Sequence, residues 1–203
     1  MNNGYPGNFI VVEGIDGSGT TTLSSRLEER IENSVWTNEP SNGYYGKMLR
    51  DSLSDEDSPN GGLSDFFMFL ADRDQHLREF IVPKLEEGKT VICDRFHAST
   101  LTYQKDNVEN RLGVPIEHFA DKCTHYWMEE PDIQLLVDVD VDIAKERREL
   151  ETKYEKEEFL MQVRRDYLDL LSRKDNMYMI DGSTPIEEVV DQAELLLSNE
   201  GII

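Results

Sequence analysis

Residues 9–22 read FIVVEGIDGSGTTT, an apolar run followed at once by a glycine-rich stretch. Gly14 and Gly19 have the four-residue separation of loops whose backbone N–H groups surround a phosphate. Such a loop needs a strand before it and a helix after it, because the helix N-terminus adds a partial positive charge. The usual pattern continues with lysine, but here Thr20 holds that position and Thr21 follows. The stretch therefore predicts either a phosphate cradle without its lysine or an ordinary tight turn.

Short β-rich runs alternate with helical patterns along the whole chain. The runs are 9–13, 35–37, 90–94, 133–139 and 177–181, and the helical patterns are 20–32, 64–86, 95–110, 116–128, 155–174 and 185–198. In the second helical pattern Ser64 is a candidate N-cap, and Pro83 is expected to bend or shorten the last turns. This alternation predicts a single α/β domain over residues 1–203, whose five-stranded parallel sheet is covered by helices on both faces. Ligands of such sheets bind at the carboxyl ends of the strands.

The charge of the chain is its most unusual bulk property. Its 203 residues include 42 acidic and 21 basic side chains, for a formal net charge of −21. Such a surface repels nucleic acid phosphates and anionic membranes, so we expect neither as a partner. It suits a protein kept soluble in high salt, where self-repulsion is screened. We therefore favour a halophilic source over an ordinary acidic enzyme.

Two further features indicate a cytoplasmic protein. No apolar stretch approaches the roughly 18 residues of a membrane helix, and the first residues, MNNGYPGN, lack the basic and apolar regions of a signal peptide. Cys93 and Cys123 are too few for a disulfide framework or a metal cluster, and Cys93 lies inside an apolar run. Both observations favour a reducing cytoplasm.

A second group of polar residues follows the run 90–94. Asp94 ends this apolar run, which suits a carboxylate that organises magnesium. A helix beginning at Arg95 would place Arg95, Ser99 and Tyr103 on one face at four-residue spacing. Thr100 and Gln104 would lie beside them. These groups suit a phosphate, a sugar and a base edge; the alternative is a solvated helix start with Tyr103 in the core.

Phe69 and Arg73 lie one helical turn apart in 66-FFMFLADR-73. An aromatic face with a guanidinium beside it can stack on a nucleobase and donate to its edge. In isolation a core position is the better interpretation of Phe69, since its neighbours in 66–69 are apolar as well.

Taken together, these motifs resemble the thymidylate kinases, which phosphorylate dTMP with ATP. The matching segments are 9-FIVVEGIDGSG-19, 37-TNEP-40, 46-GKMLRDSL-53, 69-FLADR-73, 94-DRFHASTLTYQ-104, 135-LLVDV-139 and 167-YLDL-170. The resemblance covers about residues 9–195, and the block 94–104 is its most specific part. It implies a three-layer P-loop NTPase fold with a short helical lid near 146–158, magnesium and ATP, a homodimer, and a role in dTDP synthesis.

The resemblance also assigns roles to individual residues. ATP phosphates would lie on the loop made of Gly14, Ile15, Asp16, Gly17, Ser18, Gly19, Thr20 and Thr21. The acceptor dTMP would be held by Asp16, Glu39, Arg50, Phe69, Arg73, Arg95, Ser99, Thr100, Tyr103 and Gln104. Within this set, Asp16 would contact the sugar 3′-hydroxyl, Arg50 and Arg95 the dTMP phosphate, and Tyr103 would pack beneath the deoxyribose. Thr21, Asp94 and Glu39 would order the magnesium ion.

The sequence departs from the family pattern at two positions near the phosphates. Asn38 replaces the arginine of an Arg-Glu-Pro triplet, and Thr20 replaces the loop lysine. Losing one preorganised donor of this kind costs a rate factor of about 10²–10³. Some thymidylate kinases hold phosphates with arginines of the lid, so we expect Arg147 or Arg148 to compensate, with Lys153 a further candidate. A solvated, charged helix is the alternative interpretation of this segment. The expected catalytic residues are therefore Arg95, Arg147, Arg148 and Asp16.

Two other functions remain open. A deoxynucleoside kinase would use thymidine as acceptor, although Asp16 and Arg95 suit an acceptor that already carries a phosphate. A catalytically weak or inactive nucleotide-binding homologue would explain the missing lysine, but it has no physical need for a nearly complete acceptor site.

Overall fold

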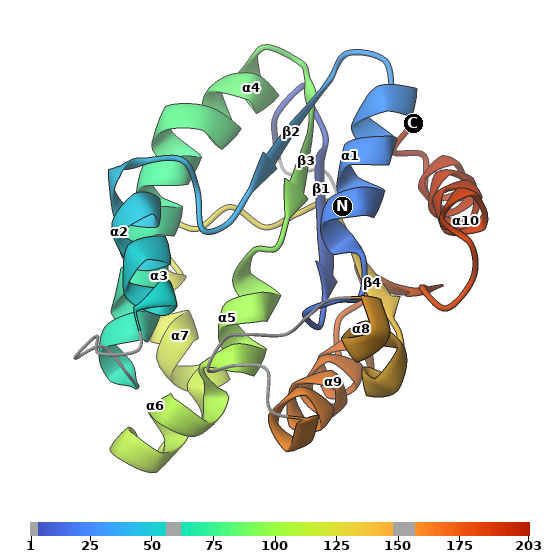
Figure 1. Ribbon diagram of the computed structural model, residues 1–203. Coiled ribbons are helices and arrows are strands. Elements are labelled where there is room, and N and C mark those ends of the chain that lie inside the picture. The colour runs from blue at the N-terminus through green and yellow to red at the C-terminus, as the bar shows by residue number, and fades with distance from the viewer. Residues whose placement is uncertain (1–3, 56–61, 148–156) are drawn as a thin grey trace.

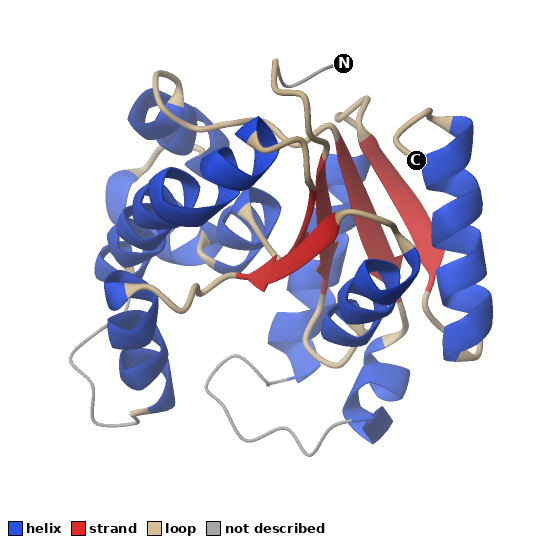
Figure 2. Cartoon of the chain, turned by 90° about the horizontal axis from the view of Figure 1, so that it is seen from above, coloured by secondary structure: helices blue, strands red, loops and turns tan. Residues whose placement is uncertain are grey.

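The computed structural model describes residues 4–55, 62–147 and 157–203. Its core is a five-stranded sheet in the order β2-β3-β1-β4-β5, and every neighbouring pair is parallel (Figures 1 and 2). The strands are β1 (Phe9–Gly14), β2 (Ser34–Asn38), β3 (Thr90–Asp94), β4 (Ile133–Asp138) and β5 (Met177–Asp181). The helices are α1 (Thr20–Arg30), α2 (Tyr44–Ser54), α3 (Leu63–His76), the π-helical η1 (Leu77–Ile81), α4 (Val82–Glu86), α5 (His97–Tyr103), α6 (Lys105–Leu112), α7 (Ile116–Thr124), α8 (Val141–Arg147), α9 (Glu157–Leu171) and α10 (Ile186–Asn199). The expected five-stranded parallel sheet with flanking helices is confirmed.

Helices cover both faces of the sheet because its strands are apolar on both sides. Along β1, Ile10 and Val12 pack against α1 and α10, and this cluster includes Leu23. Phe9 and Val11 point to the other face, where they pack with residues of η1 and α4. In Figure 1, α1 and α10 accordingly lie on the right of the sheet and α4 on its left.

The order of the strands brings two distant loops together. β1 and β3 are neighbours, with Val12 opposite Asp94. Since parallel strands end at the same edge, the loop after Gly14 and the residues after Asp94 meet there. This edge carries most of the residues singled out in the sequence.

The helix expected over 95–110 is wrong in its start and in its continuity. Arg95 has a left-handed backbone, with φ of 68°, so α5 begins only at His97. Gln104, with φ of −100° and ψ of 0°, separates α5 from α6. Arg95 therefore reaches its neighbours from the turn before the helix.

The helix expected over 64–86 is also interrupted. It begins at Leu63 after Gly62, so Ser64 lies in the first turn and is not the N-cap. The π-helical segment ends immediately before the turn that contains Pro83, which has no N–H for the helical ladder. The apolar stripe is nevertheless buried as expected, at Phe66, Leu70, Leu77, Ile81 and Leu85. Other expected ends differ by a few residues: α1 ends at Arg30, α7 at Thr124 and α9 at Leu171.

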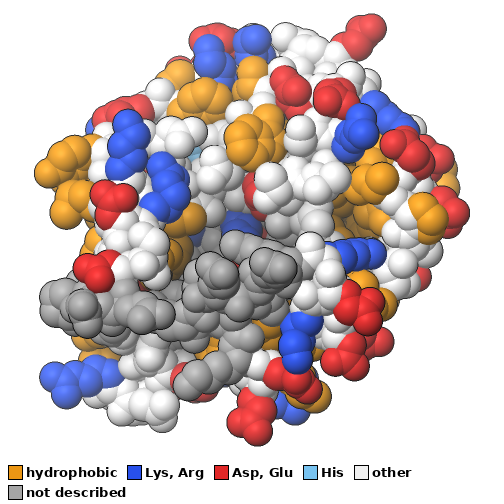
Figure 3. All heavy atoms as spheres, in the orientation of Figure 1, with side chains coloured by type: hydrophobic (Ala, Val, Ile, Leu, Met, Phe, Trp, Pro, Cys, Tyr) orange, Lys and Arg blue, Asp and Glu red, His pale blue; other side chains and the backbone are white. Residues whose placement is uncertain are grey.

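Within the described residues, no helix has both the length and the apolar character to cross a membrane. On the face shown in Figure 3, acidic side chains are scattered over several elements and do not form one patch.

Candidate active site

The glycine-rich loop joins β1 to the N-terminus of α1. Gly17 and Gly19 have φ of 83° and 101°, which residues with a Cβ adopt only with strain. Ser18 donates its N–H to the carbonyl oxygen of Ile15 at 3.0 Å, and the Ile15 side chain is buried in the core. The loop therefore has the strand–loop–helix geometry of an anion cradle, with the positive end of α1 at its mouth.

Thr21 and Asp94 form a pair at the start of α1 and the end of β3. The Thr21 hydroxyl donates to Asp94 Oδ2 at 2.5 Å. Asp94 Oδ1 is buried without a hydrogen-bond partner among the described residues. A hydroxyl beside an unsatisfied carboxylate oxygen suits Mg²⁺, which takes one or two protein oxygens and completes its shell with water and phosphate. Consistent with so few protein ligands, the described part of the chain contains no group of three or more His, Cys, Asp or Glu residues that could hold a metal.

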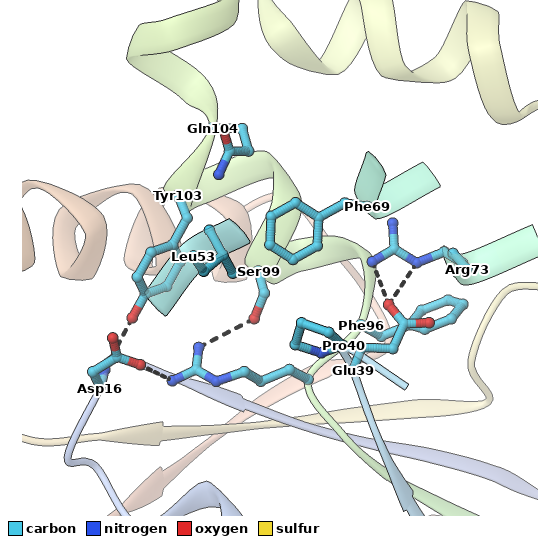
Figure 4. Close-up of a pocket in the computed structure, with 11 residues that line it drawn as sticks. Asp16, Glu39, Pro40, Leu53, Phe69, Arg73, Phe96, Ser99, Tyr103 and Gln104 are labelled. Carbon is cyan, nitrogen blue, oxygen red and sulfur yellow. Dashed lines mark hydrogen bonds and ion pairs between the residues drawn. The ribbon is translucent and has the colours of Figure 1, made fainter. Parts of the chain in front are cut away.

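A pocket opens beside this loop (Figure 4). It is lined by Asp16, Glu39, Pro40, Leu53, Phe69, Arg73, Arg95, Phe96, Ser99, Tyr103 and Gln104. Most of the expected acceptor residues are thus brought together, although they come from the loop, the residue after β2, helix α3, and the segment from the turn before α5 to Gln104. Pro40, Leu53 and Phe96 belong to the lining without having been expected.

Arg95 connects the pocket to the glycine-rich loop. Its guanidinium donates to Asp16 Oδ1 at 2.7 Å, to the Gly14 carbonyl at 2.8 Å and to Ser99 Oγ at 3.3 Å. It also lies 5.3 Å from the centroid of the Tyr103 ring. Burial opposes its charge, but Tyr103, Asp16 and other acidic groups nearby outweigh burial and raise the pKa of Arg95 well above its ordinary value. A permanent, rigidly held positive charge therefore faces the pocket.

Tyr103 lies between Arg95 and the loop. Its hydroxyl oxygen accepts the Asp16 backbone N–H at 2.9 Å. Burial raises the pKa of the Tyr103 hydroxyl above its ordinary value, so this residue stays protonated at neutral pH. The Tyr103 ring is thus held by the bond from Asp16 to its hydroxyl and by the Arg95 guanidinium beside it. It can therefore form a rigid wall of the pocket.

Arg73 is completely buried and almost fully satisfied. Its Nε and Nη2 donate to Glu39 Oε2 at 3.0 and 2.5 Å, and Nη2 also donates to Thr100 Oγ1 at 3.0 Å. Its Nη1 lies 3.2 Å from His97 Nδ1. Burial, and then the charge of Arg73, lower the pKa of His97 well below 6.5, so Nδ1 is an acceptor. Of the five guanidinium N–H groups, one remains on Nη1 after these contacts with described residues.

Glu39 is held from both sides. Oε2 accepts from Arg73, and Oε1 lies 3.2 Å from His76 Nδ1. The other ring nitrogen of His76 lies 2.7 Å from the Thr37 hydroxyl. Both carboxylate oxygens of Glu39 thus have partners, and one of them accepts two hydrogen bonds from the Arg73 guanidinium.

Two other expected residues lie just outside the lining. Thr100 is buried behind the pocket as an acceptor for Arg73. Arg50 lies near the mouth, where its Nη1 donates to the carbonyl oxygens of Pro40 and Ser41 at 2.5 and 2.6 Å. Arg50 therefore orders the loop that contributes Pro40 to the pocket.

A family model described as thymidylate kinase matches residues 12–193. The chain belongs to the thymidylate kinase family. The expectation drawn from the sequence motifs is thereby confirmed.

Several relatives resemble this chain over nearly their whole length. A probable thymidylate kinase of Methanosarcina acetivorans is 37% identical over 196 residues, which are 92% of this chain and 93% of the relative. A thymidylate kinase of Chlamydia muridarum is 38% identical over 200 residues, with coverage of 92% and 97%. A probable thymidylate kinase of Natronomonas pharaonis is 32% identical, with coverage of 94% and 99%.

Solved structures agree with the fold. The thymidylate kinase of Candida albicans superposes with a TM-score of 0.87 over 97% of this chain and 93% of that chain, at 21% identity. That of Ehrlichia chaffeensis gives a TM-score of 0.74 at 28% identity, with coverage of 94% and 98%.

The lid candidate Arg147 reaches the glycine-rich loop. It is the last residue of α8, and its Nη1 lies 3.3 Å from the Ser18 carbonyl oxygen. A Cβ added to Gly17 would collide with the Ala144 carbonyl, so α8 packs directly against the loop. Arg148 and Lys153 lie outside the described residues, as does most of the expected lid 146–158.

Some residues of the site were not foreseen. Glu13 and Tyr167 are buried behind Ser99, while His76 and His97 support Glu39 and Arg73. Glu13 gave a signal, because it is an acid at the end of an otherwise apolar run. The two histidines gave none, since only the fold shows what surrounds them.

Proposed function

We propose that this chain transfers the γ-phosphoryl group of ATP to dTMP, giving dTDP and ADP. The observation that supports the proposal is the pocket in Figure 4, because a guanidinium, aromatic rings and an amide side chain line it beside the glycine-rich loop. Binding geometry and electrostatics supply most of the rate in phosphoryl transfer, so the positioning of these groups is the mechanism.

On the acceptor side, Arg95 would bind the dTMP phosphate at the edge it shares with the loop. Asp16, bonded to Arg95, would accept the 3′-hydroxyl of the sugar. Tyr103 would pack beneath the deoxyribose and disfavour a 2′-hydroxyl. Arg50 would approach the phosphate from the mouth of the pocket only by leaving the Pro40 carbonyl.

The base would be read from the other side of the pocket. Phe69 would stack on thymine, and the remaining Nη1–H of Arg73 would donate to a thymine carbonyl. Gln104 is buried in the pocket wall, where its amide can meet the base edge. Because Glu39, Thr100 and His97 hold Arg73 in place, little side-chain entropy is lost when the base binds.

On the ATP side, Gly14, Ile15, Asp16, Gly17, Ser18, Gly19, Thr20 and Thr21 would surround the phosphates. Thr21 and Asp94 would hold Mg²⁺, which neutralises phosphate charge when bound. Glu39, whose carboxylate oxygens contact Arg73 and His76, remains a further candidate for ordering the metal from the sequence alone.

Arg147 is our candidate for the charge that the missing lysine would supply. Thr20 is buried and carries no charge, whereas the Arg147 guanidinium already lies at the loop. It would stabilise charge that develops on the transferred group. Arg148 remains a second candidate from the sequence alone.

A coupled assay for ADP release tests the reaction with ATP and magnesium. We expect turnover with dTMP, and none with thymidine, at low or molar KCl. Transfer to thymidine alone would identify a deoxynucleoside kinase. No turnover at either salt concentration, with dTMP still bound, would identify a nucleotide-binding homologue.

Arg147→Ala tests the compensation. We expect kcat to fall by about 10²-fold with dTMP affinity unchanged, as for loss of one preorganised donor. Lys145→Ala is the matched control, because Lys145 lies in the same helix but pairs with Glu157 on the surface. An unchanged kcat in Arg147→Ala would refute this role.

We also propose a homodimer in the cytoplasm. Exposed apolar side chains on α2 and α3, among them Tyr44, Met48 and Phe67, support a covered surface. Cys93 and Cys123 are both free thiols, as in a reducing compartment. Sedimentation equilibrium tests the dimer, and a monomer at micromolar concentration would contradict it.

A further inference from the structure

The reaction proposed above makes no use of one buried acid near the site, Glu13. Glu13 is fully buried in β1, on the face that also carries Phe9 and Val11. Its carboxylate accepts the Phe96 N–H at 3.0 Å, the Ser99 hydroxyl at 2.6 Å and the Tyr167 hydroxyl at 3.0 Å. Burying a carboxylate is costly even when it is hydrogen-bonded, whereas an apolar residue would be buried there without that cost.

The hydrogen of the Ser99 hydroxyl has a fixed direction. Ser99 has one hydroxyl hydrogen, and its shortest contact is with the carboxylate, which only accepts when ionised. The oxygen of Ser99 is then left as an acceptor, with the Tyr167 hydroxyl at 2.8 Å and Arg95 Nη1 at 3.3 Å. Burial raises the pKa of Glu13, but the contacts with Ser99, Arg95, Tyr167 and the Phe96 N–H all favour its charged form.

Glu13 also acts on the backbone of Arg95. The left-handed conformation of Arg95 is strained for a residue with a long side chain, and such strain persists only where the surroundings enforce it. Here the Arg95 N–H donates to the Val12 carbonyl at 2.8 Å, and the next N–H, of Phe96, donates to Glu13. Two consecutive hydrogen bonds to β1 thus hold Arg95 in place.

We propose that Glu13 is a positioning residue for recognition of the acceptor phosphate: it holds Arg95 in its left-handed conformation and directs a Ser99 lone pair to the Arg95 guanidinium. The proposal rests on the function proposed above, in which Arg95 binds the dTMP phosphate. This role explains why Glu13 is buried behind Arg95, although Glu13 itself would contact neither dTMP nor ATP.

Glu13→Gln tests the proposal, since it keeps the size of the side chain but places a donor among three donors. We expect the Kd for dTMP, measured by calorimetry, to rise about tenfold, in the range set by one disturbed charge-assisted contact. The Kd values for thymidine and for ATP should stay within about twofold of wild type, because neither ligand uses the acceptor-phosphate contact of Arg95. Glu129→Gln is the matched control, as Glu129 accepts the Tyr5 hydroxyl in the loop before β4, at the opposite edge of the sheet.

A double-mutant cycle with Arg95→Ala separates positioning from general stability. Adding Glu13→Gln to Arg95→Ala should cause no further loss of dTMP affinity, because the guanidinium that Glu13 positions through Ser99 is already missing. Additive losses, or equal losses for dTMP and thymidine, would overturn the proposal. If Glu13→Gln does not fold, a double-mutant cycle of Ser99→Ala with Arg95→Ala tests the contact between Ser99 and Arg95. Additive losses of dTMP affinity in that cycle would also overturn the proposal. A wild-type protein that fails to bind dTMP would instead refute the proposed function itself.

Discussion

Thr20 poses the main chemical question at the scale of single residues. If Arg147 supplies the charge that the loop lysine normally supplies, the two positions must act on the same phosphate. We therefore expect Thr20→Lys to raise kcat and to make Arg147→Ala much less harmful, because residues that share one partner are not additive. A double-mutant cycle in kcat should give a coupling free energy of about 1–3 kcal/mol.

The steady-state assay with dTMP measures all four proteins of this cycle. Thr20→Ser, which keeps the hydroxyl and leaves the charge unchanged, is the control. Independent effects of Thr20→Lys and Arg147→Ala would mean that Arg147 acts elsewhere, even though it lies near the Ser18 carbonyl.

His97 offers a test of how Arg73 is held. His97 Nδ1 must accept from Arg73, which only the neutral ring can do. His97→Ala should weaken dTMP binding by about fivefold, and His97→Asn should recover most of it, because an amide oxygen can accept the same N–H. Equal affinities in the alanine and asparagine variants would contradict the role assigned to Nδ1.

The lowered pKa of His97 also gives a stability prediction. Below pH 6.5, the ordinary value, the unfolded chain protonates His97 while the folded chain does not. The folded state therefore loses stability as pH falls from 7 toward 5. Urea unfolding at pH 5, 6 and 7 should show a steeper loss for wild type than for His97→Asn, and parallel losses would refute a neutral buried His97.

At the scale of elements, Arg164 fixes the position of α8. From α9 it binds Asp138 at the end of β4 through two bonds, of 2.7 and 2.9 Å, and it also pairs with Asp140. The Asp140 carbonyl accepts the Ala144 N–H in the first turn of α8, the helix that ends at Arg147. The contacts of Arg164 with Asp138 and Asp140 therefore set the position at which Arg147 meets the glycine-rich loop.

Arg164→Ala should accordingly affect both stability and turnover. We expect a loss of roughly 1–2 kcal/mol, or about 2–8 °C in Tm, from the broken charge-assisted bonds. We also expect kcat to fall several-fold while dTMP affinity is unchanged. Arg165→Ala is the control, because Arg165 bonds only Gln162 on the surface of the same helix among the described residues. A loss of Tm without any loss of kcat would limit Arg164 to a structural role.

The elements also show what the sequence can predict. Apolar runs such as 9–13 predicted the strands, because both faces of the sheet are buried. Spacing placed Arg95, Ser99 and Tyr103 together correctly, but for a wrong reason: Arg95 precedes the helix, and hydrogen bonds from β1 hold it there. Helix α2 was missed because its exposed Tyr44, Tyr45 and Met48 obscure an amphipathic stripe. Hydrogen bonds between distant segments, such as those from Arg95 and Phe96 to β1, leave no local pattern in the sequence.

For the whole molecule, the net charge of −21 dominates the electrostatic contribution to stability. Acidic side chains outnumber basic ones even where ion pairs form. For example, Arg30 of α1 is shared by three acids of α10, which are Glu187, Asp191 and Glu194. At low ionic strength such groups repel one another over about 10 Å, whereas at 1 M salt that distance is about 3 Å. Repulsion should therefore reduce the free energy of unfolding most in dilute buffer.

We predict that Tm rises steeply between 0.05 and about 0.5 M KCl and then changes slowly, because screening is largely complete once the Debye length is near about 4 Å. Exclusion of salt from the protein surface would instead give a rise that continues to molar concentrations. Thermal melts in KCl, compared with melts in sucrose at matched osmolarity, separate the two. Sucrose leaves charge repulsion intact, so it should not reproduce the early rise. A Tm that is flat below 0.5 M KCl would show that the acidic surface has no destabilising effect in dilute buffer, and the expectation of a salt-adapted protein would lose its physical basis.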